Sequence, residues 1–429
     1  MKFTAAGDVI IQKRIYEGYE GFETIKPFIM QGDARFFNLE TTLNREGETW
    51  ASQHSGGTYI RTNPDVLEDM KALGFNMTSF NNNHMLDFSY GGLLATINAV
   101  EESGLVHGGV GKNLGEAAAP RYLETKNGRV ALIAVNTSFH PALMAGNAAP
   151  RVPGRPGING MRVQTHITLP EKELKEIRRI AQMTNINASR EITRQEGYLP
   201  PLSDSEAELG EIKFSLGEKA ETVFKINPAD IKRVEEAIYE AKLQADYILI
   251  SLHSHQITGK AKENVPAFLR DFAHKLIDMG AHAIVGHGPH LLRPIEVYKE
   301  CPIFYSLGDF ILQLYSIDFA PADFFEKHGL DASCTVHDLL KKRSENFTVG
   351  LMEDPRMYRA VIPYWETEGT RLKKLCLMPV EGKMNGNKSE EGLPFRGAEK
   401  EIFEYISEMS KPYGTKMRLT DDGIIECSW

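Results

Sequence analysis

The sequence predicts a layered α/β protein, and two observations support this fold class. Apolar, strand-like runs alternate with helical segments along most of the 429 residues, which is the pattern of a sheet covered by helices. Five of the apolar runs also end in polar side chains, at the point where an open α/β sheet places its ligands. The length allows one large domain with elaborations, or two domains.

The predicted elements follow along the chain. The first helix covers residues 64–74, because Pro64 suits a first helical turn and Gly74 suits a helix end. The apolar run 129–135 is a buried strand. Further helices are predicted over 91–103, 228–244, 265–279 and 398–409, and further strands over 247–252, 283–285 and 302–306.

The alternation breaks between about residues 141 and 226. Residues 150–157 are rich in proline and glycine, residues 171–183 predict a charged amphipathic helix, and residues 191–211 are polar and irregular. We interpret this segment as an insertion on the core fold, which either covers an active site or decorates the periphery. A second irregular stretch, 316–353, can also lie near the site.

Composition excludes some classes of function. A net charge of −9 argues against a protein that binds the phosphate backbone of nucleic acids. The four cysteines are scattered without CxxC spacing, so we expect free thiols in a reducing compartment. No signal peptide and no apolar run of 18 residues is visible, so no membrane span is predicted. The sequence as written indicates a cytoplasmic protein, and an extracytoplasmic one only if a leading segment has been removed. It indicates no oligomeric state.

The strongest functional signal is a pair of histidines, His287 and His290, which follow the apolar run 283–285. Gly288 and Pro289 force a tight turn that can aim both rings inward, and neutral imidazole binds zinc, iron, manganese and similar ions. Such a pair is more often structural when it stands alone. Four other apolar runs end in comparable residues, namely Gly7-Asp8, Asn38-Leu39-Glu40, Asn81-Asn82-Asn83-His84 with Asp87, and His253-Ser254-His255.

The order of these motifs resembles the CapA family (poly-γ-glutamate capsule synthesis proteins), a branch of the calcineurin-like metallophosphoesterase superfamily. The resemblance covers residues 1 to about 312, and residues 286–310 are its most specific part. It implies an α/β fold of the four-layer αββα sandwich type, here with the inserted segment at about 141–226. We expect a CapA-like domain over 1–380 and a helical and strand extension over 381–429 packed on the core. Capsule-synthesis members usually carry a membrane anchor, which this sequence does not show.

The resemblance also implies one or two divalent metal ions. Glu40 stands where the superfamily has its bridging aspartate, and a carboxylate can bridge two ions. One ion would be held by Asp8, Glu40 and His290, and the other by Glu40, Asn83, His253 and His287. These mixed nitrogen and oxygen donors suit Mn, Fe, Zn or Co.

Two departures from the superfamily pattern affect this assignment. Ile10 replaces the histidine of the superfamily's first motif, so the ion at Asp8 has fewer protein ligands and should be the weaker one. The spacing of three between His287 and His290 is wider than in the superfamily but is typical of the CapA branch.

We expect His84 to transfer protons, because the charge of a histidine changes near neutral pH. Its neighbour Asn83 points a different way, so one side chain can face metal and the other substrate. Asp87 can orient the imidazole of His84 or cap a helix. His84 can alternatively be a buried histidine bonded to a carbonyl.

Four further residues, His54, His255, Arg293 and Asp309, are candidates for substrate contacts or for supporting the metal ligands. His255 should share a face with His253, and His54 lies in a flexible loop. Arg293 can pair with an anionic substrate or form a surface salt bridge. The remaining histidines, which show no constellation and are interpreted as structural or exposed, are His107, His140, His166, His274, His282, His328 and His337.

These parts predict a metal-dependent hydrolase. The ions would activate water for attack on a phosphoester or, less favourably, an amide, and His84 would protonate the leaving group. The resemblance points to poly-γ-glutamate or cell-envelope polymer metabolism, with an anionic polymer, peptide or phosphoester as substrate. Two alternatives stay open. An epimerase would use His84 to remove an α-proton beside a polarised carbonyl, and a scaffold would bind polymer with degraded metal sites.

Overall fold

The structure is a computed structural model that describes residues 1–385 and 387–429. The chain divides into two compact units. The main unit comprises Met1–Met161 and Lys232–Trp429, and the small unit comprises Arg162–Ile231. Helices and strands are mixed in both, so the predicted α/β class is confirmed.

The larger sheet of the main unit has β1 near its centre. β1 (Lys2–Ile10) runs parallel to β2 (Ala34–Leu39) and to β19 (Asp309–Leu312), and antiparallel to β20 (Arg359–Glu368). The other strands of this sheet are β5 (Met77–Ser79), β6 (Val106–Gly108), β21 (Arg371–Gly382), β22 (Pro394–Arg396), β23 (Lys416–Leu419) and β24 (Ile425–Ser428).

The second sheet has β15 and β16 in its middle. β15 (Tyr247–His253) lies between β9 (Gly128–Asn136) and β16 (Ala283–His287), and all three strands are parallel. The register pairs His253 with His287, so both rings leave the same edge of the sheet. The sheet is completed by β8 (Arg121–Thr125), β17 (Ile295–Tyr298) and β18 (Cys301–Phe304). Two short pairs stand apart, β3 (Thr42–Leu43) with β4 (Arg61–Thr62) and β7 (Val110–Gly111) with β10 (Gly157–Ile158).

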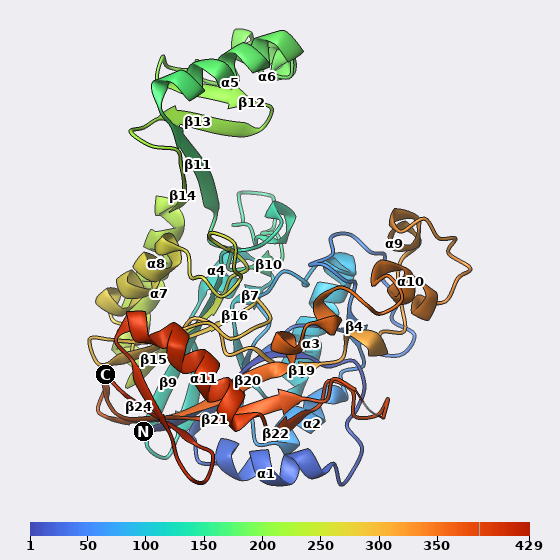
Figure 1. Cartoon of the computed structure of the whole chain (residues 1–429), viewed down its shortest axis with the longest axis vertical. Coiled ribbons are helices and arrows are strands. Elements are labelled where there is room, and N and C mark those ends of the chain that lie inside the picture. The colour runs from blue at the N-terminus through green and yellow to red at the C-terminus, as the bar shows by residue number, and fades with distance from the viewer. Residues whose placement is uncertain (386) are drawn as a thin grey trace. The chain divides into compact units, whose positions relative to one another are not determined.

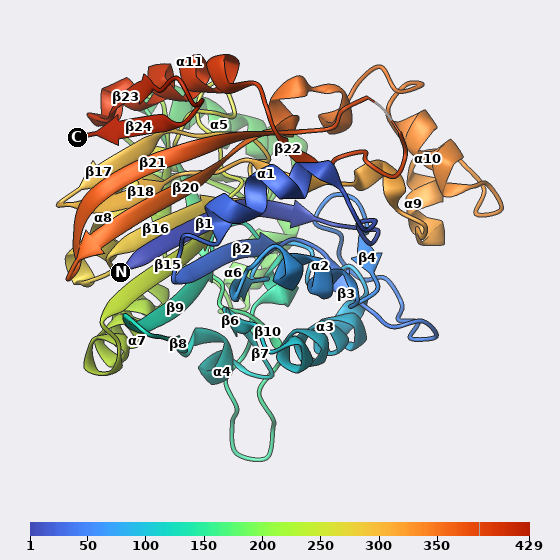
Figure 2. The ribbon, with the colours of Figure 1, turned by 90° about the horizontal axis from the view of Figure 1, so that it is seen from below.

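The two sheets of the main unit pack face to face. Alternate residues of a strand point to opposite faces of its sheet, so each sheet can turn one apolar face toward the other. Phe3 and Phe36 of the larger sheet share one core with Leu132 and Leu249 of the second sheet. Figure 2 shows the strands of the two sheets as stacked layers, with α1 on the larger one. The opposite face of β1 and β2 shares a second core with three helices, α1 (Glu20–Ile29), α2 (Val66–Ala72) and α3 (Ser89–Ser103).

Most predicted elements of the main unit are confirmed with small shifts at their ends. The predicted helices correspond to α2, α3, α7 (Pro228–Gln244), α8 (Ala267–Met279) and α11 (Glu399–Ser410). The stretch 316–353 contains two short helices, α9 (Ala322–Lys327) and α10 (Val336–Arg343), and α4 (Leu114–Ala118) was not predicted. The four-layer sandwich and the bounds 1–380 and 381–429 stay predictions.

The small unit has a sheet and a core of its own. Its strands are ordered β12 (Glu206–Leu209), β13 (Ile212–Leu216), β11 (Val163–Leu169) and β14 (Glu221–Ile226). Figure 1 shows α5 (Glu171–Thr184) and α6 (Ala188–Gln195) beside β12 and β13. Leu174 of α5 shares a core with Ala207 and Phe214 of these strands. The predicted helix at 171–183 is confirmed. The prediction of irregular structure over 191–211 is wrong, because this stretch includes most of α6 and all of β12.

No helix in residues 1–385 and 387–429 combines the length and the apolar character that crossing a bilayer requires.

Candidate metal centre

The six predicted ligands come together in the main unit, at the carboxyl ends of strands from both sheets. Asp8 lies in β1, Glu40 directly follows β2, and Asn83 follows β5. His253 ends β15 and His287 ends β16, while His290 lies in the turn after β16. Parallel strands carry their carboxyl ends to one edge, which explains why residues so distant in sequence meet.

The first group joins the two sheets. The Nδ1 atoms of His253 and His287 lie 2.8 Å apart, and the Nδ1 atom of His287 lies 3.7 Å from Oδ1 of Asp8. Asn38 Nδ2 donates a 2.7 Å hydrogen bond to Asp8 Oδ1, and the Gly288 N–H donates one of 2.8 Å to Oδ2. These bonds hold the Asp8 carboxylate toward the histidines.

The second group forms around Asn83. Its Oδ1 atom lies 2.8 Å from Nε2 of His253 and 3.1 Å from Nε2 of His255. Asn83 Nδ2 donates a 2.8 Å hydrogen bond to the carbonyl of Gly56, which leaves Oδ1 facing the histidines. Glu40 Oε1 lies 3.7 Å from the same His253 atom. His255, predicted to contact substrate or to support the metal ligands, is therefore part of the cluster.

The third group forms around His290. Its Nδ1 atom lies 3.0 Å from Oδ1 of Asp309 and 4.0 Å from Oδ2 of Asp8. Its Nε2 atom lies 4.0 Å from Oε1 of Glu40. Asp8, His290 and Asp309 can thus point ligand atoms at one position. The structure places Asp309 among the candidate ligands, although the sequence pattern suggested only a supporting role.

Glu40 lies close to the second and third groups. Its side chain is fully buried, and neither carboxylate oxygen forms a hydrogen bond with a described residue. Its Oε1 atom lies 3.7–4.0 Å from ring nitrogens of His84, His253, His255 and His290. Burial, reinforced by the nearby carboxylate of Asp8, raises the pKa of Glu40 well above its ordinary value. A buried carboxylate without partners is costly, and a bound cation would remove this cost.

The electrostatics of the histidines suit metal binding. Burial lowers the pKa of His253 and of His255 well below the ordinary value, and it lowers the pKa of His287 to about 4. All three imidazoles are therefore neutral at neutral pH, which is the form that binds metal. His290 differs, because Asp309 and Asp8 outweigh the effect of burial and raise its pKa.

The donor set and its spacing fit divalent metal ions. Adjacent ligand atoms around an ion with bonds of about 2.1 Å lie about 3.0–3.4 Å apart. Around Nε2 of His253, the distances to Oδ1 of Asn83 and Nε2 of His255 are 2.8 and 2.9 Å, close to that spacing. Carboxylate, amide and imidazole donors together suit Mn, Fe, Zn or Co. Two ions about 4 Å apart need a shared ligand, and Oε1 of Glu40 lies 3.7 Å from Nε2 of His253 and 4.0 Å from Nε2 of His290.

The backbone around the histidine pair is tightly constrained. A Cβ atom at Gly286 would lie 2.5 Å from the carbonyl oxygen of Phe304, so the strand end accepts only glycine. His290 has a φ of 62°, in the left-handed region that side chains rarely adopt. Strain of this kind concentrates at functional sites, because the surrounding structure must enforce it.

His84 and Asp87 form a buried pair beside the cluster. Nδ1 of His84 lies 2.8 Å from Oδ2 of Asp87, and Nε2 of His84 lies 3.9 Å from Oε1 of Glu40. Asp87 also accepts hydrogen bonds from the backbone N–H groups of Gly56 and Ile60. This geometry agrees neither with a helix-capping role for Asp87 nor with a His84 that bonds to a backbone carbonyl. The N-cap of α3 is Phe88, and His84 bonds to a carboxylate.

The structure places two other candidates in unexpected surroundings. His54 stacks on His140, with ring centroids 3.6 Å apart. His140 therefore forms a pair with a candidate site residue, although the sequence pattern indicated a structural or exposed histidine. The surface salt bridge considered for Arg293 is wrong, because Arg293 is fully buried. Its Nε and Nη2 atoms donate to the carbonyls of Lys262 and Gln256, at 2.9 and 2.8 Å.

Sequence reasoning missed one residue that supports a ligand. Ser251 lies on β15 two residues before His253, and its Oγ atom is 2.7 Å from Nε2 of His287. A donor or acceptor at Nε2 decides which nitrogen of His287 faces the centre. The signal was the alternation of the strand, which places Ser251 on the same face as His253.

Comparisons with known proteins place these motifs in a family. The family model described as bacterial capsule synthesis protein PGA_cap matches residues 2–314. An uncharacterized protein of Sinorhizobium fredii is 31% identical over 431 residues, which cover 97% of this chain and 91% of that protein. The capsule biosynthesis protein CapA of Bacillus anthracis is 23% identical over 318 residues, which cover 72% of this chain and 59% of CapA. A probable polyglutamine synthesis accessory protein of Mycobacterium tuberculosis is 26% identical over 279 residues, which cover 65% of this chain and 55% of that protein.

The matched region contains the whole candidate centre, from Asp8 to Asp309. The Sinorhizobium relative extends the likeness over nearly the full chain. The chain therefore belongs to the bacterial capsule synthesis protein family PGA_cap, the CapA family that the motif order indicates.

Proposed function

We propose that this chain is a metal-dependent hydrolase of the metallophosphoesterase type. The observation that carries the proposal is the meeting of Asp8, Asn83 and four histidines around the unpartnered, buried carboxylate of Glu40. The His84–Asp87 pair lies beside this cluster. The face-to-face packing of the two sheets supports a four-layer sandwich, with α1–α3 outside the larger sheet.

Two divalent ions fit the centre. One would be held by Asp8, Asp309 and Nδ1 of His290, and the other by Glu40, Asn83, His255 and Nε2 of His253. His287 would contribute its Nδ1 atom on the Asp8 side of the His253 ring, 3.7 Å from the Asp8 carboxylate. Bound ions of this kind polarise a phosphoryl or acyl oxygen, activate water and stabilise the negative charge that develops. Asp309 adds a ligand beside Asp8, where Ile10 is buried and apolar.

His84 is placed to move a proton. A proton on Nδ1 donates to Asp87 and leaves Nε2 facing Glu40 and the centre. Asp87 is itself fixed by the N–H groups of Gly56 and Ile60, so the imidazole has one orientation. When Nε2 also carries a proton, the resulting imidazolium can donate that proton to a leaving group without binding metal.

The substrate class follows from the family and its relatives. The family is described as capsule synthesis, and one relative is named a polyglutamine synthesis accessory protein. We infer that the substrate belongs to poly-γ-glutamate or cell-envelope polymer metabolism. The scissile group is a phosphoester or, alternatively, an amide of an anionic chain.

The decisive experiment combines elemental analysis with a substrate screen. Protein purified without chelator and then supplied with Mn, Fe, Zn or Co is tested on phosphoesters and γ-glutamyl peptides. We expect bound metal and metal-dependent hydrolysis of at least one substrate class. Exchange of an α-proton with deuterated solvent, without hydrolysis, would instead indicate an epimerase. Absence of both metal and turnover would leave a polymer-binding scaffold.

The role of Ser251 gives a first prediction. Ser251→Ala should weaken metal binding by about 10–100-fold, the usual effect of removing a group that orients a ligand. Competition with a chelator measures this change. Ser410→Ala is the matched control, because Ser410 is equally buried but bonds to Ile295 away from the centre. Equal metal affinity in Ser251→Ala and the wild type would contradict the ligand role of His287.

Metal stoichiometry gives a second prediction. Protein purified without added metal should contain one ion or a substoichiometric pair, because the ion at Asp8 lacks the histidine replaced by Ile10. At saturating metal the wild type should bind two ions, and Asp309→Ala should bind about one. Elemental analysis of both proteins measures this difference, with Asp278→Ala on the surface as the control. Two tightly held ions in Asp309→Ala would show that Asp309 is not a ligand.

A further inference from the structure

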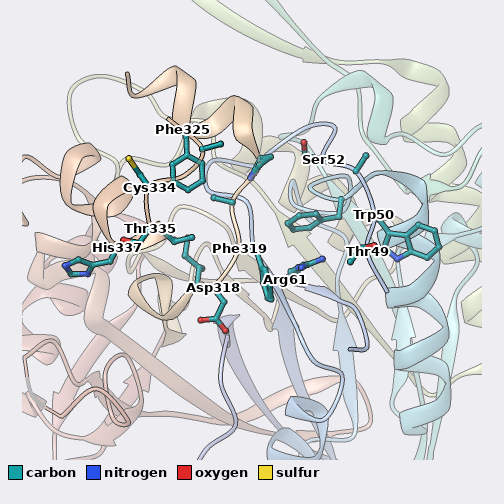
Figure 3. A pocket seen from close by; sticks show the side chains of 17 residues that line it. Thr49, Trp50, Ser52, Arg61, Asp318, Phe319, Phe325, Cys334, Thr335 and His337 are labelled. Atoms are coloured by element: carbon teal, nitrogen blue, oxygen red, sulfur yellow. The ribbon is translucent and has the colours of Figure 1, made fainter. Parts of the chain in front are cut away.

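A cavity of about 810 Å³ in the main unit has a lining unlike that of the metal centre. Four aromatic side chains, Trp50, Phe88, Phe319 and Phe325, line it together with the guanidinium group of Arg61. Figure 3 shows Arg61 and Phe319 side by side in the middle of the lining, with Trp50 on one side and Phe325 on the other. The cavity thus combines apolar walls with one fixed positive charge.

The guanidinium group of Arg61 contacts two aromatic rings. Its central carbon lies 3.9 Å from the ring centroid of Phe319 and 5.1 Å from that of Phe88. Across residues 1–385 and 387–429, no carboxylate pairs with Arg61 and no hydrogen bond engages its side chain. Asp318 lines the same cavity but pairs with Lys13. Arg61 therefore presents unused, pre-oriented donors to whatever occupies the cavity.

Two residues of the lining are chain neighbours of residues at the His84–Asp87 pair. Arg61 directly follows Ile60, whose N–H donates a 2.9 Å hydrogen bond to Oδ2 of Asp87. Phe88 directly follows Asp87 in the chain. The backbone that positions Arg61 and Phe88 is therefore continuous with the backbone that positions Asp87.

We propose that this cavity is a subsite for a carboxylate-bearing residue of an acidic peptide chain. The carboxylate would pair with Arg61, and the methylene groups of the chain would lie on the aromatic rings. The proposal rests on the proposed function and deepens it. A single guanidinium matches one carboxylate in charge and in geometry. A dianionic phosphate would keep uncompensated charge beside Asp318.

The test uses metal-loaded protein and γ-linked triglutamate, whose α-carboxylates project from a methylene-containing backbone. The reference ligand is the same peptide with its carboxylates amidated. Calorimetric titration should show tighter binding of the acid than of the amide. Arg61→Gln should weaken binding of the acid roughly 10- to 100-fold, the worth of a hydrogen-bonded charge pair, with metal content unchanged. Arg61→Lys keeps the positive charge but loses the paired N–H donors of the guanidinium group. Its affinity for the acid should therefore lie between those of the wild type and Arg61→Gln.

Arg45→Gln is the matched control, because it removes the same charge from an exposed arginine that pairs with Glu102. Wild-type affinity in Arg61→Gln, or equal binding of acid and amide by the wild type, overturns the proposal. Displacement of the peptide by inorganic phosphate at similar concentrations, only when Arg61 is present, would reassign the cavity to phosphate. In another outcome, the wild type holds no metal and shows no turnover, yet binds the acid in a way that depends on Arg61. That result would refute the hydrolase proposal and leave the subsite proposal standing.

Discussion

Replacement of His84 by alanine should reduce turnover by a factor on the order of 10²–10⁴, the usual worth of general acid–base catalysis. Metal content and folding should stay nearly unchanged, because His84 bonds to Asp87 and its Nε2 atom only faces the centre. Turnover on the substrate found in the screen, together with elemental analysis of the same sample, measures both effects.

The matched comparison is Asn83→Ala, one residue away. Asn83 presents its Oδ1 atom to His253 and His255, so its removal should lower metal content and turnover together. If His84→Ala loses metal, His84 is a ligand and the assignment of roles is wrong. If neither variant changes a turnover that the wild type shows, the cluster is not catalytic.

Glu40→Gln should have opposite effects on metal binding and on the stability of the metal-free protein. Metal affinity should fall at least ~100-fold, since even groups behind the ligands are worth 10- to 100-fold. The metal-free variant should unfold at a higher temperature than the metal-free wild type at pH 8. Glutamine fills the same space without a negative charge, so the buried, unpartnered carboxylate no longer opposes folding.

The pH dependence of this effect has a definite sign. Burial and Asp8 raise the pKa of Glu40 in the folded protein. A carboxyl group of this kind stabilises the fold at pH values below its unfolded pKa, and this contribution is lost as the pH rises through the folded pKa. The advantage of metal-free Glu40→Gln should therefore grow from pH 5 to pH 8 in thermal unfolding.

A buried carboxylate with partners is the control for Glu40. Glu296 is buried but bonds to Arg270 and Tyr305. Glu296→Gln should thus lower stability at pH 8 and leave metal binding intact. Equal unfolding temperatures of metal-free Glu40→Gln and wild type at pH 8 would show that the Glu40 carboxylate does not destabilise the metal-free fold.

The main unit was largely predictable because its signals are local. Helices such as α7 and α8 show the periodicity and the end residues that mark helices in any context. The strands before Asp8, Glu40, His253 and His287 are apolar runs, since they are buried on both faces. Topology then brings their ends together, so a list of strand ends was enough to find the cluster.

The rest depended on contacts that sequence does not display. The strands of the small unit are short, rich in polar residues and bury few side chains, so they resemble loops in composition. Arg293 was misjudged because arginine is rarely buried, and its partners are backbone carbonyls, which no residue type reveals. The place of Asp309 among the ligands follows from the parallel pairing of β19 with β1, which sets Asp309 opposite Asp8.

The pairing of β19 with β1 has a consequence for how the chain folds while it is being translated. A ribosome releases the N-terminal strand β1 and its neighbour β2 long before β19 and β20, which also pair with β1 in the finished sheet, exist. Pairings so remote in sequence form slowly, and a strand edge that waits for its partners is prone to aggregation. The nascent chain therefore cannot complete its metal centre until some 300 further residues have emerged, as the register of Asp8 with Asp309 requires. Metal uptake would then report completed folding, and a shortage of metal during expression should appear first as insoluble protein.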